Sequence, residues 1–228
     1  MRLACLFSGG KDSTYSVLRA KEMGHETACL ITLHPAADDS LVFHYPNSQI
    51  TKHLAESMQI PLIESNIQGK SKEDESQALE NTVVQAKALY SINGVLNGGI
   101  SSRFQKQVFD KVCLNNKLTP VAPMWGADPV VYMHELLDSG FQIMIVAVSA
   151  MGLGKEWLGT ILDKHSLDTL YALSKKNGFN VNFEGGEAET LVIDCPIYHK
   201  KLQVKNADIH WDGQRGMFEI RDAALVEK

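Results

Sequence analysis

The stretch Ser8-Gly9-Gly10-Lys11-Asp12-Ser13 decides the fold that this sequence of 228 residues predicts. The apolar run 3–7 precedes it and a helical pattern over 14–23 follows it, so the order is strand, glycine turn and helix N-terminus. Glycine has no Cβ, which lets the backbone approach a ligand closely. The first turn of a helix adds N–H donors and the positive end of the helix dipole. The sequence therefore predicts an anion site at this turn.

The side chains of the same stretch suit a polyphosphate. Lys11 adds a positive charge, Ser8 and Ser13 add hydroxyls, and Asp12 is the residue that could hold Mg²⁺ beside a phosphate. The stretch is not a Walker A loop, because G-x-x-x-x-G-K-[ST] is absent. An ordinary strand-to-helix turn with a serine cap is the alternative. We favour a polyphosphate-binding turn formed by residues 8–13, called the cradle below, because open α/β sheets place ligands where their first strand ends.

Residues 8–13 resemble the loop of the N-type ATP pyrophosphatases, the PP-loop enzymes. The resemblance implies a HUP/Rossmann-like PP-loop fold that uses ATP and Mg²⁺. It also implies that ATP is cleaved between its α and β phosphates: AMP passes to a substrate oxygen, pyrophosphate leaves, and a nitrogen or sulfur nucleophile then displaces AMP.

Composition narrows the choice of partners and compartment. The formal net charge is -5, with 27 acidic and 22 basic residues and no basic block, so we expect no broad nucleic-acid surface. No apolar run reaches the roughly 18 residues of a membrane helix, and residues 1–2 lead straight into the first strand, leaving no room for a signal peptide. The four cysteines form no C-x-x-C pair. A cytoplasmic protein is expected.

Strand and helix patterns alternate along the first two thirds of the chain, which predicts α/β architecture with a doubly wound, mostly parallel sheet. Segment 119–126 is too rich in proline for a central strand and is interpreted as a connector. Segment 143–148 is the most hydrophobic strand and is expected to be central. We expect an ATP-binding domain over 1–150 and a smaller C-terminal α+β lobe that binds substrate over 151–228.

Two further segments should lie at the same edge of the sheet as the cradle. Gly98 and Gly99 end a short strand, and Arg103 follows in the first turn of the next helix, where a phosphate or carboxylate contact is favoured over a free surface position. The polar loop 34–46, which contains His44, also leaves the end of a strand. It is either an adenine or substrate lid or a plain surface loop.

The segment Glu184-Gly185-Gly186-Glu187-Ala188-Glu189-Thr190 places three carboxylates around a glycine turn, directly before an apolar strand. Like charges this close repel, so the cluster is most easily explained by a cation. Mg²⁺ on a nucleotide, a basic substrate and ammonium are the candidates. An acidic surface turn is the alternative.

This acidic turn, together with the apolar run and Asp-Cys-Pro after it, resembles the C-terminal signature of the diphthine–ammonia ligase family. Segments 98–105, 123–125 and 138–148 resemble further parts of that family, so the resemblance covers nearly the whole chain. Phe183 is a departure, since the family usually has glycine before the first glutamate. A different backbone path into the turn can result.

The resemblance implies amidation of diphthine, the modified histidine of elongation factor 2, by ATP and ammonium through an acyl adenylate, with release of AMP and pyrophosphate. It implies catalytic roles for Lys11, Asp12, Arg103, Glu187 and Glu189, with Asp12 as the metal contact. ATP would be bound by Ser8, Gly9, Gly10, Lys11, Asp12, Ser13, Gly98 and Gly99. The substrate would be bound by His44, Ser102, Arg103, Gln105, Glu184, Gly185, Gly186, Glu187, Glu189 and Thr190.

Two alternatives stay open at this point. One is another PP-loop ATP pyrophosphatase, such as a tRNA-modifying enzyme, although thiolation usually needs paired cysteines. The other is a nucleotide-binding module without turnover. No glutaminase segment is present, so free ammonium is the expected nitrogen source. A homodimer is left open.

Overall fold

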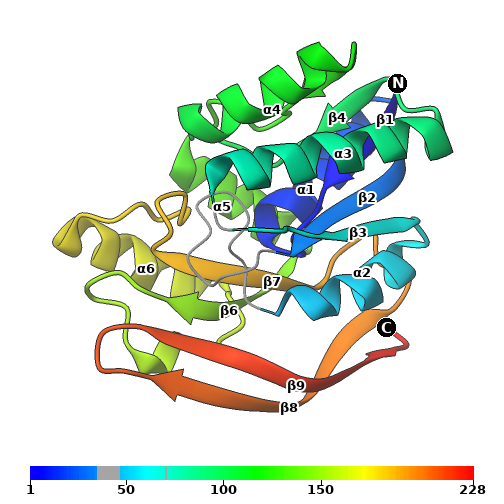
Figure 1. The fold of residues 1–228 in the computed structure, drawn as a ribbon. Coiled ribbons are helices and arrows are strands. Elements are labelled where there is room, and N and C mark those ends of the chain that lie inside the picture. Colours follow the sequence, from blue (N-terminus) through cyan, green and yellow to red (C-terminus); the bar gives the residue numbers. More distant parts are fainter. Residues whose placement is uncertain (35–46, 70) are drawn as a thin grey trace. The chain divides into compact units, whose positions relative to one another are not determined.

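Two units make up the fold in the computed structural model, which describes residues 1–34, 47–69 and 71–228 (Figure 1). Unit 1 consists of Met1–Ser8 and Asp12–Trp125, and unit 2 consists of Gly9–Lys11 and Gly126–Lys228. The chain therefore changes units twice within the glycine turn that follows the first strand.

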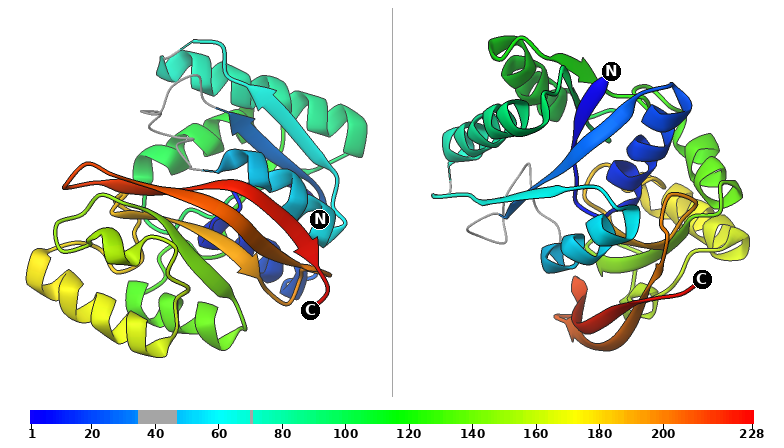
Figure 2. Two further views of the ribbon diagram at one scale, coloured as in Figure 1. Left: turned by 90° about the horizontal axis from the view of Figure 1, so that it is seen from below. Right: turned by 90° about the vertical axis from the view of Figure 1, so that its right-hand side faces the viewer.

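Unit 1 contains a five-stranded parallel sheet in the order β3-β2-β1-β4-β5. Figure 2 shows α1 and α2 on one face of this sheet and α3 and α4 on the other, which is a doubly wound arrangement. The predicted fold class is confirmed. The strands are β1 (Arg2–Leu6), β2 (Glu26–His34), β3 (Leu62–Asn66), β4 (Gly94–Leu96) and β5 (Thr119–Val121). The helices are α1 (Lys11–Glu22), the 3₁₀ turn η1 (Ser48–Ile50), α2 (Thr51–Met58), α3 (Lys72–Tyr90) and α4 (Arg103–Asn115).

A buried apolar cluster joins α3 and α4 to the sheet. It combines strand residues such as Ile31 and Val95 with helix residues such as Val83 and Val112, all of them at most 2% exposed. The cluster forms because buried parallel strands are apolar on both faces and need helices to cover them. A capping box starts α3, in which the Ser71 hydroxyl accepts from the Asp74 N–H and the Asp74 carboxylate accepts from the Ser71 N–H.

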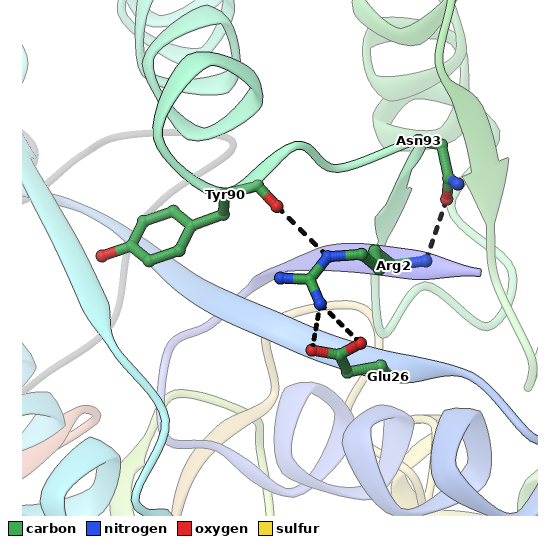
Figure 3. Close-up of polar contacts among 4 residues, drawn as sticks. All are labelled: Arg2, Glu26, Tyr90 and Asn93. Carbon is green, nitrogen blue, oxygen red and sulfur yellow. Dashed lines mark hydrogen bonds and ion pairs between the residues drawn. The ribbon is translucent and has the colours of Figure 1, made fainter.

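Arg2 is the first residue of β1, at the end of the strand that lies away from the glycine turn. It bonds to three neighbouring segments of unit 1 (Figure 3). Its backbone N–H donates to Asn93 Oδ1 over 2.9 Å and its Nε donates to the Tyr90 carbonyl over 3.3 Å. Its Nη1 donates to both carboxylate oxygens of Glu26 at 2.6 and 2.7 Å. These contacts join the starts of β1 and β2 to the segment between α3 and β4.

Unit 2 contains a four-stranded sheet in the order β7-β6-β9-β8, with antiparallel pairs throughout. Helices α5 and α6 pack against each other. A turn joins the last two strands, and the Asp212 carboxylate accepts the N–H groups of Gln214 and Arg215 there. The elements are α5 (Pro129–Asp138), β6 (Gln142–Val148), the 3₁₀ turn η2 (Lys155–Trp157), α6 (Lys164–Asn177), β7 (Ala188–Asp194), β8 (Lys201–Trp211) and β9 (Gly216–Val226).

The hydrophobic strand β6 lies elsewhere than we expected. It does lie inside a sheet, but this is the antiparallel sheet of unit 2, where it pairs with β7 and β9. The two units accordingly divide between Trp125 and Gly126, whereas the sequence led us to expect a boundary at 150. A short apolar run indicates that a strand is buried, but it does not indicate which sheet the strand joins. The sheet to which β6 belongs could therefore not be predicted from the sequence.

Segment 119–126 also differs in part. Its first three residues form β5, which pairs in parallel with β4 at the edge of the sheet. An edge position tolerates Pro120, because one side of an edge strand has no partner strand, and the N–H that proline lacks is not needed there.

Candidate active site

The helix after the glycine turn begins at Lys11, three residues earlier than the pattern from Thr14 indicated. The first N–H groups of α1 therefore come from the turn itself, where helix geometry leaves them without partners inside the helix. Within unit 1, the Ser8 N–H donates to Ser13 Oγ over 3.2 Å, and the two serine hydroxyls lie 3.1 Å apart. The fold thus brings together the two hydroxyls that the sequence assigned to phosphate.

The end of β4 lies directly against the first turn of α1. A Cβ placed on Gly98 would lie 2.6 Å from the Asp12 carbonyl carbon, 2.7 Å from its oxygen and 2.8 Å from the Ser13 nitrogen. Only glycine allows this approach of two backbones. The following turn is closed by the buried side chain of Asn97, whose Oδ1 accepts the Gly99 N–H over 3.0 Å.

Helix α4 starts just beyond this second glycine turn. Ser102 is its N-cap and accepts the Gln105 N–H over 3.5 Å, so this hydroxyl has a role in helix capping. Arg103 is exposed, and its side chain makes no hydrogen bond or ion pair with the residues that the structure describes. Its guanidinium is available to an anion.

Strand β7 of unit 2 is hydrogen-bonded to Gly9 and Lys11, which belong to the glycine turn after β1. The Val192 N–H donates to the Gly9 carbonyl over 2.9 Å, and the Lys11 N–H donates to Thr190 Oγ1 over 3.2 Å. The sequence assigned Thr190 to substrate, and the structure shows that its hydroxyl fixes the backbone of Lys11. The residues of this loop and the strand after the acidic turn are therefore one hydrogen-bonded structure.

The acidic turn is organised by Glu187. Its Oε1 accepts the Asn180 N–H over 2.9 Å and its Oε2 accepts the Gly185 N–H over 2.8 Å. Its carbonyl accepts the Ser149 N–H over 2.8 Å, and the Ser149 hydroxyl donates to the Gly186 carbonyl over 2.5 Å. The Glu187 carboxylate is thus a structural link in the turn, a role that the sequence did not reveal. Glu184 and Glu189 are half-buried.

Phe183 precedes the acidic turn with φ 61° and a side chain that is only 5% exposed. This is the left-handed region, which glycine adopts without strain and an L side chain rarely enters. The departure noted in the sequence therefore sits in a glycine-type backbone conformation. Its ring centroid lies 5.7 Å from Nζ of Lys11, which is itself 2% exposed.

Asp12 is the only residue that the sequence assigned to Mg²⁺ binding. Among the described residues, no three His, Cys, Asp or Glu side chains are grouped so that they could hold a metal ion. A Mg²⁺ ion that arrives with a nucleotide needs only one or two protein carboxylates, because phosphates and waters complete its shell. Asp12, at the N-terminus of α1, fits that requirement by its hard oxygen donors. His44 lies outside the described residues.

All four cysteines are buried free thiols. Burial raises the pKa of Cys5, Cys29 and Cys195 to about 12 and that of Cys113 to about 11. At neutral pH these groups stay protonated, so none is suited to act as a nucleophile or sulfur carrier.

A doubly wound sheet with a lysine-bearing glycine turn after its first strand defines a class of α/β proteins that bind phosphate-bearing ligands at the carboxyl ends of their strands. Comparison with protein-family models identifies residues 1–120 as "Diphthamide synthase N-terminal domain" and residues 128–226 as "Diphthamide synthase C-terminal domain". The chain belongs to the diphthamide synthase family. The predicted resemblance is confirmed.

Curated relatives in this family are named diphthine–ammonia ligase. The human protein is 33% identical over 227 residues, which cover 92% of this chain and 85% of the human one. The zebrafish protein (Danio rerio) is 32% identical over a region that covers 93% of this chain and 90% of the zebrafish one. The Schizosaccharomyces pombe protein is 28% identical over 92% of this chain but only 37% of its own length. A solved "predicted subunit of tRNA methyltransferase" from Methanocaldococcus jannaschii aligns over 86% of this chain and 97% of its own, with 16% identity and a TM-score of 0.46. In the described part of the chain, every helix is too short or too polar to cross a bilayer.

Proposed function

We propose that this chain is an ATP-dependent C–N ligase that converts the carboxylate of diphthine on elongation factor 2 into the amide of diphthamide, with ammonium as nitrogen donor. One observation supports this most directly. The Gly9–Lys11 segment is hydrogen-bonded to β7, the strand that begins within the acidic signature. The segment that we propose to bind phosphate is therefore joined by hydrogen bonds to the strand that carries the family's signature.

The first half-reaction makes the carboxyl group reactive. A carboxylate oxygen attacks the α-phosphorus of ATP, the bond between the α and β phosphates breaks, and pyrophosphate departs with its electron pair. The N–H groups at the start of α1 and the Lys11 ammonium stabilise the growing negative charge. Mg²⁺ held beside Asp12 would neutralise charge on the same phosphates.

In the second half-reaction, ammonia attacks the carbonyl carbon of the acyl adenylate and AMP leaves. Ammonium must lose one proton to become a nucleophile and a second after attack, so carboxylates near the reacting carbon are useful as acceptors. Glu184 and Glu189 are the candidates for this role, and for binding the cationic part of diphthine. Glu187 acts mainly through the turn that its carboxylate closes.

The buried cysteines weigh against the tRNA-thiolating alternative, since a sulfur carrier needs an accessible thiolate. Arg103, exposed at the start of α4, is proposed to contact the α-phosphate or the substrate carboxylate. We place the reaction in the cytoplasm, with elongation factor 2 as the macromolecular partner, and leave a homodimer open.

The test incubates the purified protein with ATP, Mg²⁺, ammonium and elongation factor 2 that carries diphthine. Formation of AMP and pyrophosphate, and of the amide by mass spectrometry, is expected only when all components are present. Lys11→Met should abolish both, while Lys21→Met, at the exposed other end of α1, should not. ATP binding without AMP formation in the complete mixture would support the non-catalytic module instead.

A further inference from the structure

We infer that Thr190 is a positioning residue for the glycine turn, and that its hydroxyl caps the start of α1 from a distant strand. The inference rests on the proposed function, in which this turn binds the phosphates of ATP. It deepens that proposal by moving Thr190 from the substrate side of the reaction to the ATP side. The segments that carry it, Gly9–Lys11 and β7, both belong to unit 2.

The residue that precedes α1 has no side chain with which to cap the helix. Helix α1 begins at Lys11, and the residue before it is Gly10. Helices usually begin after serine, threonine, aspartate or asparagine, whose side chain accepts one of the first N–H groups. Glycine at this place lets the backbone approach a ligand closely, but it offers no side-chain acceptor. A side-chain cap therefore has to come from another residue.

Thr190 supplies such an acceptor from 179 positions further along the chain. Its Oγ1 accepts the Lys11 N–H over 3.2 Å. This is the first N–H of α1, which helix geometry leaves without a partner inside the helix. Lys11 is only 2% exposed, so the loss of this acceptor would leave a buried donor poorly satisfied.

Strand β7 gives Thr190 a fixed place, because the strand is hydrogen-bonded on both of its edges. On one edge, Thr190 pairs with Ile145 in the antiparallel ladder between β6 and β7. On the other edge, the Val192 N–H donates to the Gly9 carbonyl over 2.9 Å. The tripeptide is thus bound at both ends, by a backbone bond at Gly9 and by the Thr190 hydroxyl at Lys11.

The chemistry of this contact suits a turn that binds phosphate. A hydroxyl accepts the N–H without adding a charge, whereas a carboxylate at the same place would repel the phosphates. Phosphate binding also needs N–H donors placed to within a few tenths of an ångström, because hydrogen bonds weaken quickly with distance and angle. By fixing the backbone of Lys11, Thr190 fixes the point from which those donors and the lysine side chain extend.

The experiment measures equilibrium ATP binding to the full-length protein in the presence of Mg²⁺. Thr190→Val keeps the shape of the side chain but removes the acceptor, and we expect it to weaken ATP binding about fivefold. Thr190→Ser keeps the hydroxyl and should bind ATP within about twofold of the natural protein. Thr169→Val is the matched control, because it removes a hydroxyl that donates to the His165 carbonyl within α6, and ATP binding should not change.

A second readout separates positioning of the turn from contact with the substrate. In the complete reaction mixture, Thr190→Val should raise the KM for ATP about fivefold and leave the KM for ammonium and for elongation factor 2 unchanged. Destabilisation of the fold alone would reduce the amount of active protein, and hence the apparent kcat, without selecting the KM for ATP.

Thr190→Val protein that binds ATP as tightly as the natural protein would overturn the inference, and so would Thr190→Ser protein that binds it as weakly as Thr190→Val. A rise confined to the KM for ammonium or elongation factor 2 would return Thr190 to the substrate side. If Thr190→Val does not fold, Thr190→Ala is compared with Thr190→Ser instead. A natural protein that binds ATP but forms no amide would overturn the proposed ligase function alone, whereas one that binds no ATP would overturn both.

Discussion

Substitution of Gly98 offers the sharpest test of the close contact between the end of β4 and the first turn of α1, which follows the glycine turn. In Gly98→Ala the new methyl group would lie 2.6 Å from the Asp12 carbonyl carbon, and ordinary contact begins at 3.4 Å. The end of β4 and the first turn of α1 would have to separate by about 0.8 Å. Because the obstructing atoms are backbone, no side chain can rotate away. Overpacking of this kind costs about 1–3 kcal/mol, so we expect a loss of about 2 kcal/mol in the free energy of unfolding.

Urea denaturation followed by circular dichroism measures that loss, and ATP titration measures the effect on the loop. ATP binding should weaken, because the shift moves the N–H donors at the start of α1. Gly99→Ala is the matched control for stability: its Cβ would meet only the end of the Asn97 side chain, at 3.1 Å, so a loss below about 1 kcal/mol is expected. Equal stability and equal ATP affinity for Gly98→Ala and the natural protein would refute this account of the close approach.

Three further predictions concern the acidic turn and the core. Because Phe183 has a left-handed backbone, Phe183→Gly should be more stable than Phe183→Ala by about 1 kcal/mol in thermal unfolding, whereas alanine is usually the more stable of the two. A more stable alanine variant would contradict the assigned φ. Glu187→Ala leaves two backbone N–H groups without their acceptor, so it should cost about 2 kcal/mol and speed amide exchange at Asn180, whereas Glu184→Ala should leave that exchange unchanged. Burial raises the pKa of the Cys5 thiol from 9.0 to about 12, so the unfolded chain loses this proton first as the pH rises above about 9 and folding is destabilised. That thiol should contribute a fall of about 1 kcal/mol between pH 9 and 10, and a Cys5→Ala variant with an equally steep fall would contradict it.

Much of the fold followed from local pattern. The glycine turn before α1 and the alternation of strands and helices each depend on a few adjacent residues, and both are present in the structure. The family was also readable, because two glycine-rich segments far apart in the chain carried specific residue orders. Both family models confirm it.

What the sequence could not show depends on contacts between distant segments. Nothing local to β6 says that its partners are β7 and β9, so its sheet was not foreseen. The bond from Lys11 N–H to Thr190 joins residues 179 positions apart, and the clash that requires glycine at 98 involves residue 12. Glu187 looked like a ligand for a cation because its backbone partners, at Asn180 and Gly185, become apparent only once the turn is folded.

The path of the chain through its glycine turn limits how this protein can be divided. A fragment that stops at Trp125 keeps Gly9 and Lys11 but loses Thr190 and Val192, which bond them. A fragment that starts at Gly126 keeps the outer edge of β7 but not the tripeptide that lies on it. Splitting the gene at this point should thus yield two halves that each lack the hydrogen bonds between the tripeptide and β7.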